Sequence, residues 1–151
     1  MSCSKAQLDE NRDVVIDTQV MRLYNTPSDP RYKELFAWVV KGCGKLAVSQ
    51  KLLVEYGGTQ NMLIGVLLHQ LQAEGRLIRV RNHQLNQIGI DKHYRYTCNS
   101  KDIDHARLVF LSNRKKLITH DQALADDVNG FKKVNGVKPS AVKQPSQIYY
   151  Q

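Results

Sequence analysis

The stretch DVVIDT, residues 13–18, decides the fold. Its apolar part, Val14 to Ile16, is short, continuous and β-branched, which is typical of a strand buried on both faces of a parallel sheet. The strand ends in an acid, Asp17, followed by a hydroxyl, Thr18. We therefore predict a buried strand that places a carboxylate at the carboxyl edge of a parallel sheet, where ligands of such folds bind.

Similar apolar runs alternate with helical patterns along the rest of the chain. We predict further strands at 46–49, 76–81 and 116–119, and helices at 31–41, 50–56, 59–74, 102–112 and 121–128. Asp29 and Pro30 are expected to cap and begin the first helix. The helix at 59–74 is expected to bury the face made by Met62, Leu63, Val66, Leu67 and Leu71. This order predicts an α/β domain with a central, mainly parallel sheet and right-handed crossovers.

The length of 151 residues suits a single domain. We assign residues 1–130 to that domain. Residues 131–151 contain four lysines and no acid, and we expect them to form a basic C-terminal arm. Within this arm, residues 147–150 are the candidate for an edge strand docked on the sheet.

The chain is basic, with 22 Lys and Arg against 14 Asp and Glu, a net charge of +8. This excess favours a polyanionic partner, RNA or DNA ahead of a membrane surface. We expect no signal peptide and no membrane span. The three cysteines, Cys3, Cys43 and Cys98, form no CxxC pair, so we predict neither disulfides nor zinc, and a cytoplasmic location.

Four of the scarce acids fall near the predicted strand ends. Asp17 ends the first strand, Glu55 lies in the helix after the second, Asp102 begins a later helix, and Asp121 follows the strand at 116–119. In a parallel sheet these positions converge on one edge. Clustered carboxylates are ligands for Mg²⁺ or Mn²⁺, which can activate water and neutralise a phosphodiester. The alternative is that Asp102 and Asp121 only cap their helices.

The segments around these acids resemble the motifs of PIN-domain nucleases. VVIDTQVM (14–21) is similar to their opening strand, and VSQKLLVEY (48–56) to their second motif, a serine followed by a helical Glu. The segment KDIDHARLVFLSNRKKLITHD (101–121) resembles their third and fourth motifs, in which an Asp opens a helix and a short strand ends in Thr-x-Asp. Order and spacing agree over residues 13–128.

The resemblance implies a three-layer α/β/α domain and a Mg²⁺- or Mn²⁺-dependent ribonuclease, of the kind common among toxins of toxin–antitoxin pairs. Asp17, Glu55, Asp102 and Asp121 would be the catalytic, metal-binding acids, with Asp104 competing with Asp102 as the third. A homodimer and a cognate antitoxin are the further partners that the resemblance implies.

Other residues are candidates for contacts with the substrate. Thr18 or Thr119 could hold a carboxylate or a water at the site. Arg114 and Lys115, in a basic group with Lys116, Arg76, Arg79 and Arg81, could follow an RNA backbone, or form only a solvated face. Tyr94 and Tyr96 lie among basic residues and could stack on unpaired bases. His105, beside Asp104, could orient a substrate phosphate or assist a proton transfer, but we expect it to be a partly exposed helix residue.

The sequence departs from the PIN pattern in two places. Gln19 stands where Asn usually follows Asp-Thr, and the helix after Asp102 carries Arg107 to Phe110 where small residues are usual. These departures keep a second hypothesis open, in which a PIN-like scaffold binds RNA or protein without efficient catalysis.

Overall fold

Five strands form one parallel sheet in the structure, a computed structural model that describes residues 3–9, 12–24, 30–89 and 91–145. The strands are β1 (Asp13–Ile16), β2 (Lys45–Ser49), β3 (Leu77–Val80), β4 (Lys116–Ile118) and β5 (Ser140–Val142). Their order is β3-β2-β1-β4-β5, and every neighbouring pair is parallel. The predicted α/β class and parallel sheet are confirmed.

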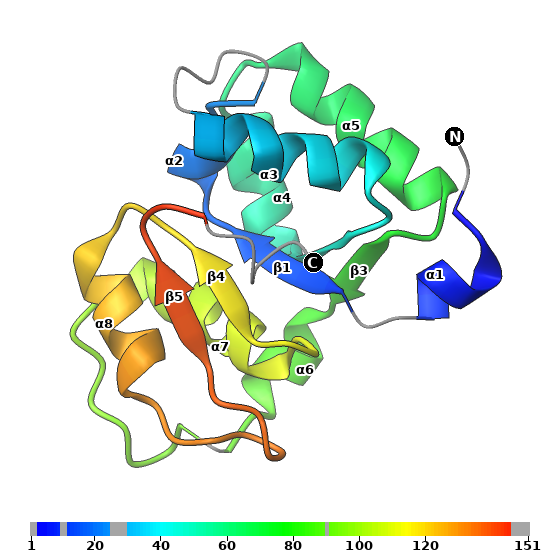
Figure 1. Cartoon of the computed structure of the whole chain (residues 1–151). Helices are drawn as coiled ribbons and strands as arrows, with labels where there is room; N and C mark the ends of the chain where they lie inside the picture. Colours follow the sequence, from blue (N-terminus) through cyan, green and yellow to red (C-terminus); the bar gives the residue numbers. More distant parts are fainter. Residues whose placement is uncertain (1–2, 10–11, 25–29, 90, 146–151) are drawn as a thin grey trace.

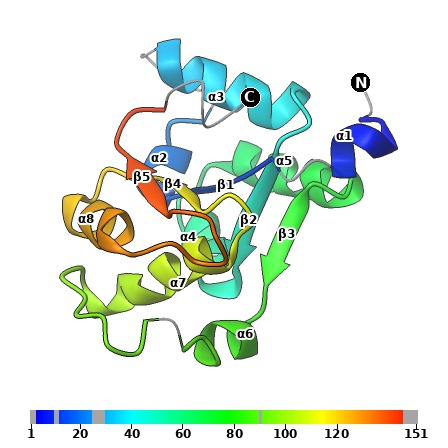
Figure 2. The same ribbon diagram turned by 60° about the horizontal axis from the view of Figure 1, so that its bottom comes forward.

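Helices flank the sheet and complete a three-layer α/β/α arrangement. They are α1 (Lys5–Asp9), α2 (Thr18–Met21), α3 (Pro30–Lys41), α4 (Gln50–Gly57), α5 (Met62–Ala73), α6 (Asn82–Asn86), α7 (Ile103–Leu111) and α8 (Gln122–Gly130), with a 3₁₀ turn, η1, at Ser100–Asp102. Helix α3 lies on one side of the sheet and α6 and α7 on the other (Figures 1 and 2). Pro30 begins α3 as predicted, and the predicted cap, Asp29, lies outside the described residues. The short helix α6 was not predicted, because its sequence NHQLN is polar.

β1 is the middle strand, and the core forms around it. Its three apolar residues, Val14 to Ile16, are buried as predicted, and Asp13 is buried as well. Asp13 is buried at the amino end of β1, where its carboxylate accepts hydrogen bonds from the backbone N–H groups of Asn113 (2.7 Å) and Arg114 (2.8 Å). These bonds fix the turn that leads into β4.

The predicted buried face of α5 is only partly correct. Leu67 and Leu71 are buried together with Ile64, whereas Met62, Leu63 and Val66 are exposed. Nearly every residue of the first two turns is apolar, so helical spacing alone does not identify the face that packs. The packing of the neighbouring elements determines that the helix face containing Ile64 is the buried one.

The structure corrects the interpretation of Arg76, which we expected either to follow an RNA backbone or to lie on a solvated face. Its side chain is 1% exposed and lies against the carboxyl end of α3. There it donates hydrogen bonds to the carbonyls of Val39 (2.6 Å) and Val40 (3.0 Å), and it pairs with Glu74. The guanidinium therefore satisfies carbonyl groups that a helix leaves free at its end.

The prediction of no disulfide is wrong, since Cys3 and Cys43 are bonded, with their Cα atoms 5.8 Å apart. The bond joins the segment before α1 to the turn between α3 and β2. The two cysteines are 40 positions apart in sequence, and this spacing alone does not indicate that they approach in space. The pairing also removes the cysteine argument for a reducing compartment.

The segment predicted to be a basic arm contributes the edge strand β5. This strand lies at 140–142 and pairs with β4, and Phe131, Val134 and Ala141 within the segment are buried. The strand predicted at 147–150 lies outside the described residues. Among the described helices, none is long and apolar enough to cross a membrane.

Candidate functional site

The strand order creates a natural position for a site between β1 and β4. From β1 the chain moves outward to β2 and β3, then returns to the other side of β1 as β4. The crossovers leave β1 and β4 in opposite directions, which opens a crevice at their carboxyl ends. Asp17 follows β1 directly, and Thr119 and Asp121 follow β4.

A hollow of about 310 Å³ lies at this position. All four predicted acids line it, and they come from four separate segments of the chain: Asp17, Glu55, Asp102 and Asp121. Thr18, Gln19, Arg22, Gly58 and Lys101 complete its lining. We refer to it as the acidic hollow.

The end of β1 fixes the Asp17 carboxylate from two directions. Asp17 is the N-cap of α2, and its Oδ1 accepts a hydrogen bond from the Thr18 N–H at 2.8 Å. Its Oδ2 accepts a second bond from the hydroxyl of Thr119 at 2.6 Å, which ties β1 to the end of β4. Both predicted threonines thus contact carboxylates here, because Thr18 Oγ1 donates to Glu55 Oε1 at 3.1 Å.

Helix α4 brings Glu55 beside Asp17. Ser49 caps this helix by accepting a hydrogen bond from the Leu52 N–H. One turn further on, the buried hydroxyl of Tyr56 donates to the carbonyl of Ile16 at the end of β1. Burial, and then the charges of Asp17 and Glu55, raise the pKa of Tyr56 well above its usual value. Tyr56 therefore remains a neutral donor that locks α4 to β1.

Asp102 and Asp104 are distinguished by their surroundings. Asp102 lines the acidic hollow and makes no side-chain cap bond to α7. Burial raises its pKa, and the charges of Asp17, Asp121 and Glu55 raise it further, against an opposing effect of His105. Asp104 instead lies 3.7 Å from Arg107 on the surface of α7.

Asp121 both caps a helix and belongs to the group of acids, which are the two alternatives that the sequence left open. It is the N-cap of α8, where its Oδ1 accepts a hydrogen bond from the Leu124 N–H at 3.0 Å. It also lines the acidic hollow. Capping and a place in the acidic hollow are therefore compatible at this residue.

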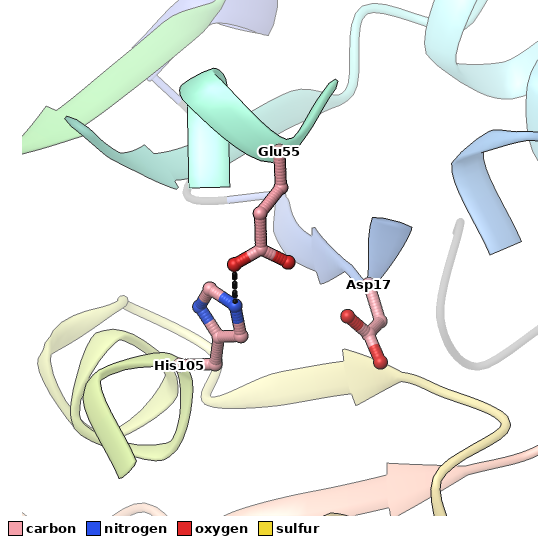
Figure 3. Close-up of side chains that lie close together, drawn as sticks. All are labelled: Asp17, Glu55 and His105. Atoms are coloured by element: carbon pink, nitrogen blue, oxygen red, sulfur yellow. Dashed lines mark hydrogen bonds and ion pairs between the residues drawn. The ribbon is translucent and has the colours of Figure 1, made fainter. Parts of the chain in front are cut away.

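His105 is the member of the site that sequence reasoning did not place among the metal ligands. The expectation of a partly exposed residue is wrong, since His105 is 2% exposed, and its Nε2 lies 2.7 Å from Glu55 Oε2 (Figure 3). Its Nδ1 is buried and has no hydrogen-bond partner among the described residues. The burial of His105 could have been predicted from helical spacing. His105 precedes the buried Leu108 and Val109 by three and four positions, which places all three on one face of the helix.

Asp17, Glu55 and His105 form a group that could hold a metal ion. Each offers one ligand atom, and these atoms all lie within 4.8 Å of one another. Figure 3 shows Glu55 from α4, His105 from α7 and Asp17 from the end of β1 around a common space. Two carboxylates and an imidazole are a chemically suitable donor set for a divalent cation.

Two of the predicted substrate-contacting residues lie elsewhere. Arg114 and Lys115 precede β4, so they lie at the amino edge of the parallel sheet, opposite the acidic hollow. Lys115 is buried, with its Nζ donating to the carbonyl of Ser112 at 2.7 Å. The direction of β4 therefore places them away from the acids. The cations that line the acidic hollow are Arg22 and Lys101.

Comparison with known proteins gives no family for this chain. No protein-family model matches it, and no curated protein matches its sequence.

Proposed function

We propose that the protein is a Mg²⁺- or Mn²⁺-dependent endoribonuclease that hydrolyses RNA phosphodiester bonds in the manner of PIN-domain nucleases. The observation that carries the proposal is the gathering of Asp17, Glu55, Asp102 and Asp121 in one hollow at the reversal point of the sheet. Helix capping alone does not bring four acids from separate segments together. Like charges in one space repel, and a divalent cation relieves that repulsion.

The residues in and around the acidic hollow would have different roles in such a site. Asp17, Glu55 and His105 would hold the cation, while Asp102 and Asp121 would supply further negative charge around it. The cation would neutralise charge on the phosphodiester and supply activated water. Thr119 and Thr18 hold the carboxylates of Asp17 and Glu55 in place.

His105 favours Mn²⁺ over Mg²⁺ in this proposal. Mg²⁺ binds oxygen donors almost exclusively, whereas an imidazole nitrogen is a better ligand for transition metals. To serve as a ligand, His105 Nε2 must exchange its contact with Glu55 for the cation. Its buried Nδ1 can then carry the ring proton.

Calorimetric titration with Mn²⁺ tests the metal site without requiring a substrate. We expect the wild type to bind Mn²⁺. Asp17→Asn should lose affinity at least about tenfold, since Asn is a good helix cap but a weaker, uncharged ligand. His105→Gln should weaken Mn²⁺ binding more than Mg²⁺ binding. Absence of Mn²⁺ binding by the folded wild type would contradict the proposal.

The second candidate is a PIN-like scaffold that binds RNA or a protein without efficient catalysis. One observation favours it: both Glu55 oxygens already have partners, His105 and Thr18, so this carboxylate is satisfied without a cation. RNA binding with no Mn²⁺ binding would support the scaffold. Comparing turnover of RNA, DNA and a phosphomonoester would separate a ribonuclease from a DNA nuclease or a phosphatase with the same carboxylate chemistry.

A further inference from the structure

A second hollow, of about 420 Å³, lies at the opposite end of α8 from the acidic hollow. Its lining is basic and aromatic: Lys92, His93, Tyr94, Phe131, Lys132 and Lys133, with Gly89 and Gly130. No acid is among these lining residues. We refer to it as the basic hollow.

The lysines of the basic hollow are available to an anion. Lys92, Lys132 and Lys133 are exposed, and among the described residues their side chains have no hydrogen-bond or ion-pair partner. The nearby carboxylate of Asp127 is turned inward and accepts bonds from the backbone N–H groups of Thr97 (2.9 Å) and Cys98 (2.8 Å). The positive charge of the basic hollow is therefore not neutralised by this acid.

Tyr94 gives the basic hollow a fixed aromatic wall. Its hydroxyl donates to the carbonyl of Asp127 at 3.1 Å, and its ring packs against those of Tyr96 and Phe131, with centroids 5.1 and 5.3 Å away. Gly130 permits this approach, because a Cβ at that position would lie 2.9 Å from the Tyr94 hydroxyl. A ring held in this way can receive a flat ligand at little entropic cost.

Two chain segments connect the basic hollow to the acidic one. Helix α8 begins next to Asp121 in the acidic hollow and ends at Gly130 in the basic hollow, a length of about 13 Å for its 9 residues. Residues 94–102 run beside α8 in the reverse direction, from Tyr94 in the basic hollow to Asp102 in the acidic one (Figures 1 and 2). The two hollows thus lie at opposite ends of the pair of segments formed by α8 and residues 94–102.

We propose that the basic hollow binds an unpaired nucleotide of the RNA strand whose phosphodiester enters the acidic hollow. The base stacks on Tyr94, and Lys92, Lys132 and Lys133 contact the adjoining phosphates. Lysines and an aromatic face in one hollow are the combination that recognises single-stranded nucleic acid. The identity of the polymer as RNA rests on the proposed function.

Binding of a labelled 12-nucleotide single-stranded RNA, measured by fluorescence anisotropy in EDTA, tests the lysines without cleavage. The double variant Lys132→Gln/Lys133→Gln should raise the Kd about tenfold and reduce the slope of log K against log salt by about 1.4. The matched control, Lys33→Gln/Lys41→Gln, removes the same charge from exposed positions on α3 and should change neither quantity. Equal effects of the two double variants would overturn the proposal.

Two further measurements test for an unpaired, stacked base. Tyr94→Leu should raise the Kd about tenfold through lost stacking, whereas Tyr94→Phe keeps the ring and should bind within about twofold of the wild type. A duplex of the same sequence should bind more weakly than the single strand, since its bases are already stacked. Equal affinity for duplex and single strand would overturn the proposal, whatever the stability of the Tyr94 variants.

The outcomes separate this proposal from the proposed function. If the wild type cleaves RNA with Mn²⁺ but both lysine double variants bind RNA alike, the basic hollow is not the binding site, and the nuclease proposal stands. If RNA binding depends on Lys132, Lys133 and Tyr94 but no cleavage occurs, the nucleotide site stands and the nuclease proposal fails.

Discussion

Asp102 and Asp104 are separated by a single residue and have different environments. The 3₁₀ turn η1 ends at Asp102 and places its carboxylate beside the other acids, and α7 then turns Asp104 toward Arg107. A carboxylate that is partly buried among like charges gains more from a bound cation than one already paired with a guanidinium.

This contrast gives a matched pair of substitutions. We predict that Asp102→Asn lowers Mn²⁺ affinity about tenfold or more, and that Asp104→Asn leaves it within about twofold of the wild type. Both changes preserve side-chain shape. Calorimetry on the two variants, with circular dichroism to verify folding, provides the measurement. A larger effect of Asp104→Asn would assign the third acid to Asp104.

Asp127 is predicted to stabilise the protein in a pH-dependent way. Burial alone would raise its pKa, but the hydrogen bonds from Thr97 and Cys98 outweigh burial and lower it. The stabilisation is thus fully present above the unfolded-state pKa of about 4 and is lost as pH falls through the lower folded-state value.

Asp127→Asn should therefore cost about 2 kcal/mol at pH 7, and the difference from the wild type should shrink below about pH 4. Urea unfolding from pH 3 to 7 measures this difference. A difference that grows toward low pH would contradict the assigned direction of the shift.

The turn between α3 and β2 depends on Gly44. A Cβ on Gly44 would lie 2.3 Å from the indole ring of Trp38, closer than packed atoms approach. Gly44→Ala should therefore destabilise the protein by about 1–3 kcal/mol. The matched control is Gly57→Ala in α4, where a Cβ meets open space; it should be neutral or stabilise by up to about 1 kcal/mol. Urea unfolding of both variants tests the contrast, and equal stabilities would contradict it.

The disulfide fastens α1 to the same turn. Because Cys3 and Cys43 lie 40 residues apart, opening the bond should cost roughly 2–4 kcal/mol of unfolding free energy. We predict that dithiothreitol lowers the Tm of the wild type to that of Cys3→Ser, and that the variant itself does not respond. A wild-type Tm unchanged by the reductant would show that the bond makes no contribution.

The elements that the sequence predicted are those with a strong local pattern. The strand at 13–16 has a continuous β-branched run, and the helices at 30–41 and 50–57 have capping residues and apolar stripes. The strand at 140–142 was missed because three residues between Pro139 and Lys143 carry no periodicity. The approach of Cys3 to Cys43 was not predicted, because it depends on where the segment before α1 lies relative to the turn between α3 and β2.

In the candidate site, too, some residues could be located from the sequence and others could not. Strand ends in a parallel sheet converge by topology, so the positions of Asp17 and Asp121 followed from strand assignments. The contact of His105 with Glu55 was not predicted because the two residues are 50 positions apart in sequence. Arg114 lies at the amino edge of the sheet, away from the acids, because it precedes β4.

For the molecule as a whole, the net charge of +8 is unevenly arranged. Four of the 14 acids line one hollow, and a basic, aromatic hollow lies about one helix length away along α8. A polyanion would be repelled by the acids alone and attracted by the lysines. A cation in the acidic hollow would offset the repulsion by the acids, so that an RNA strand could contact both hollows.

Cleavage of an end-labelled single-stranded RNA with Mn²⁺ tests the proposed nuclease function most directly, with the wild type, Asp17→Asn and a surface control, Glu34→Gln. We predict cleavage by the wild type and the control, none in EDTA, and a rate at least about 100-fold lower for Asp17→Asn at an unchanged Tm. Cleavage by folded Asp17→Asn at the wild-type rate, or no cleavage by the wild type, would contradict a nuclease centred on Asp17.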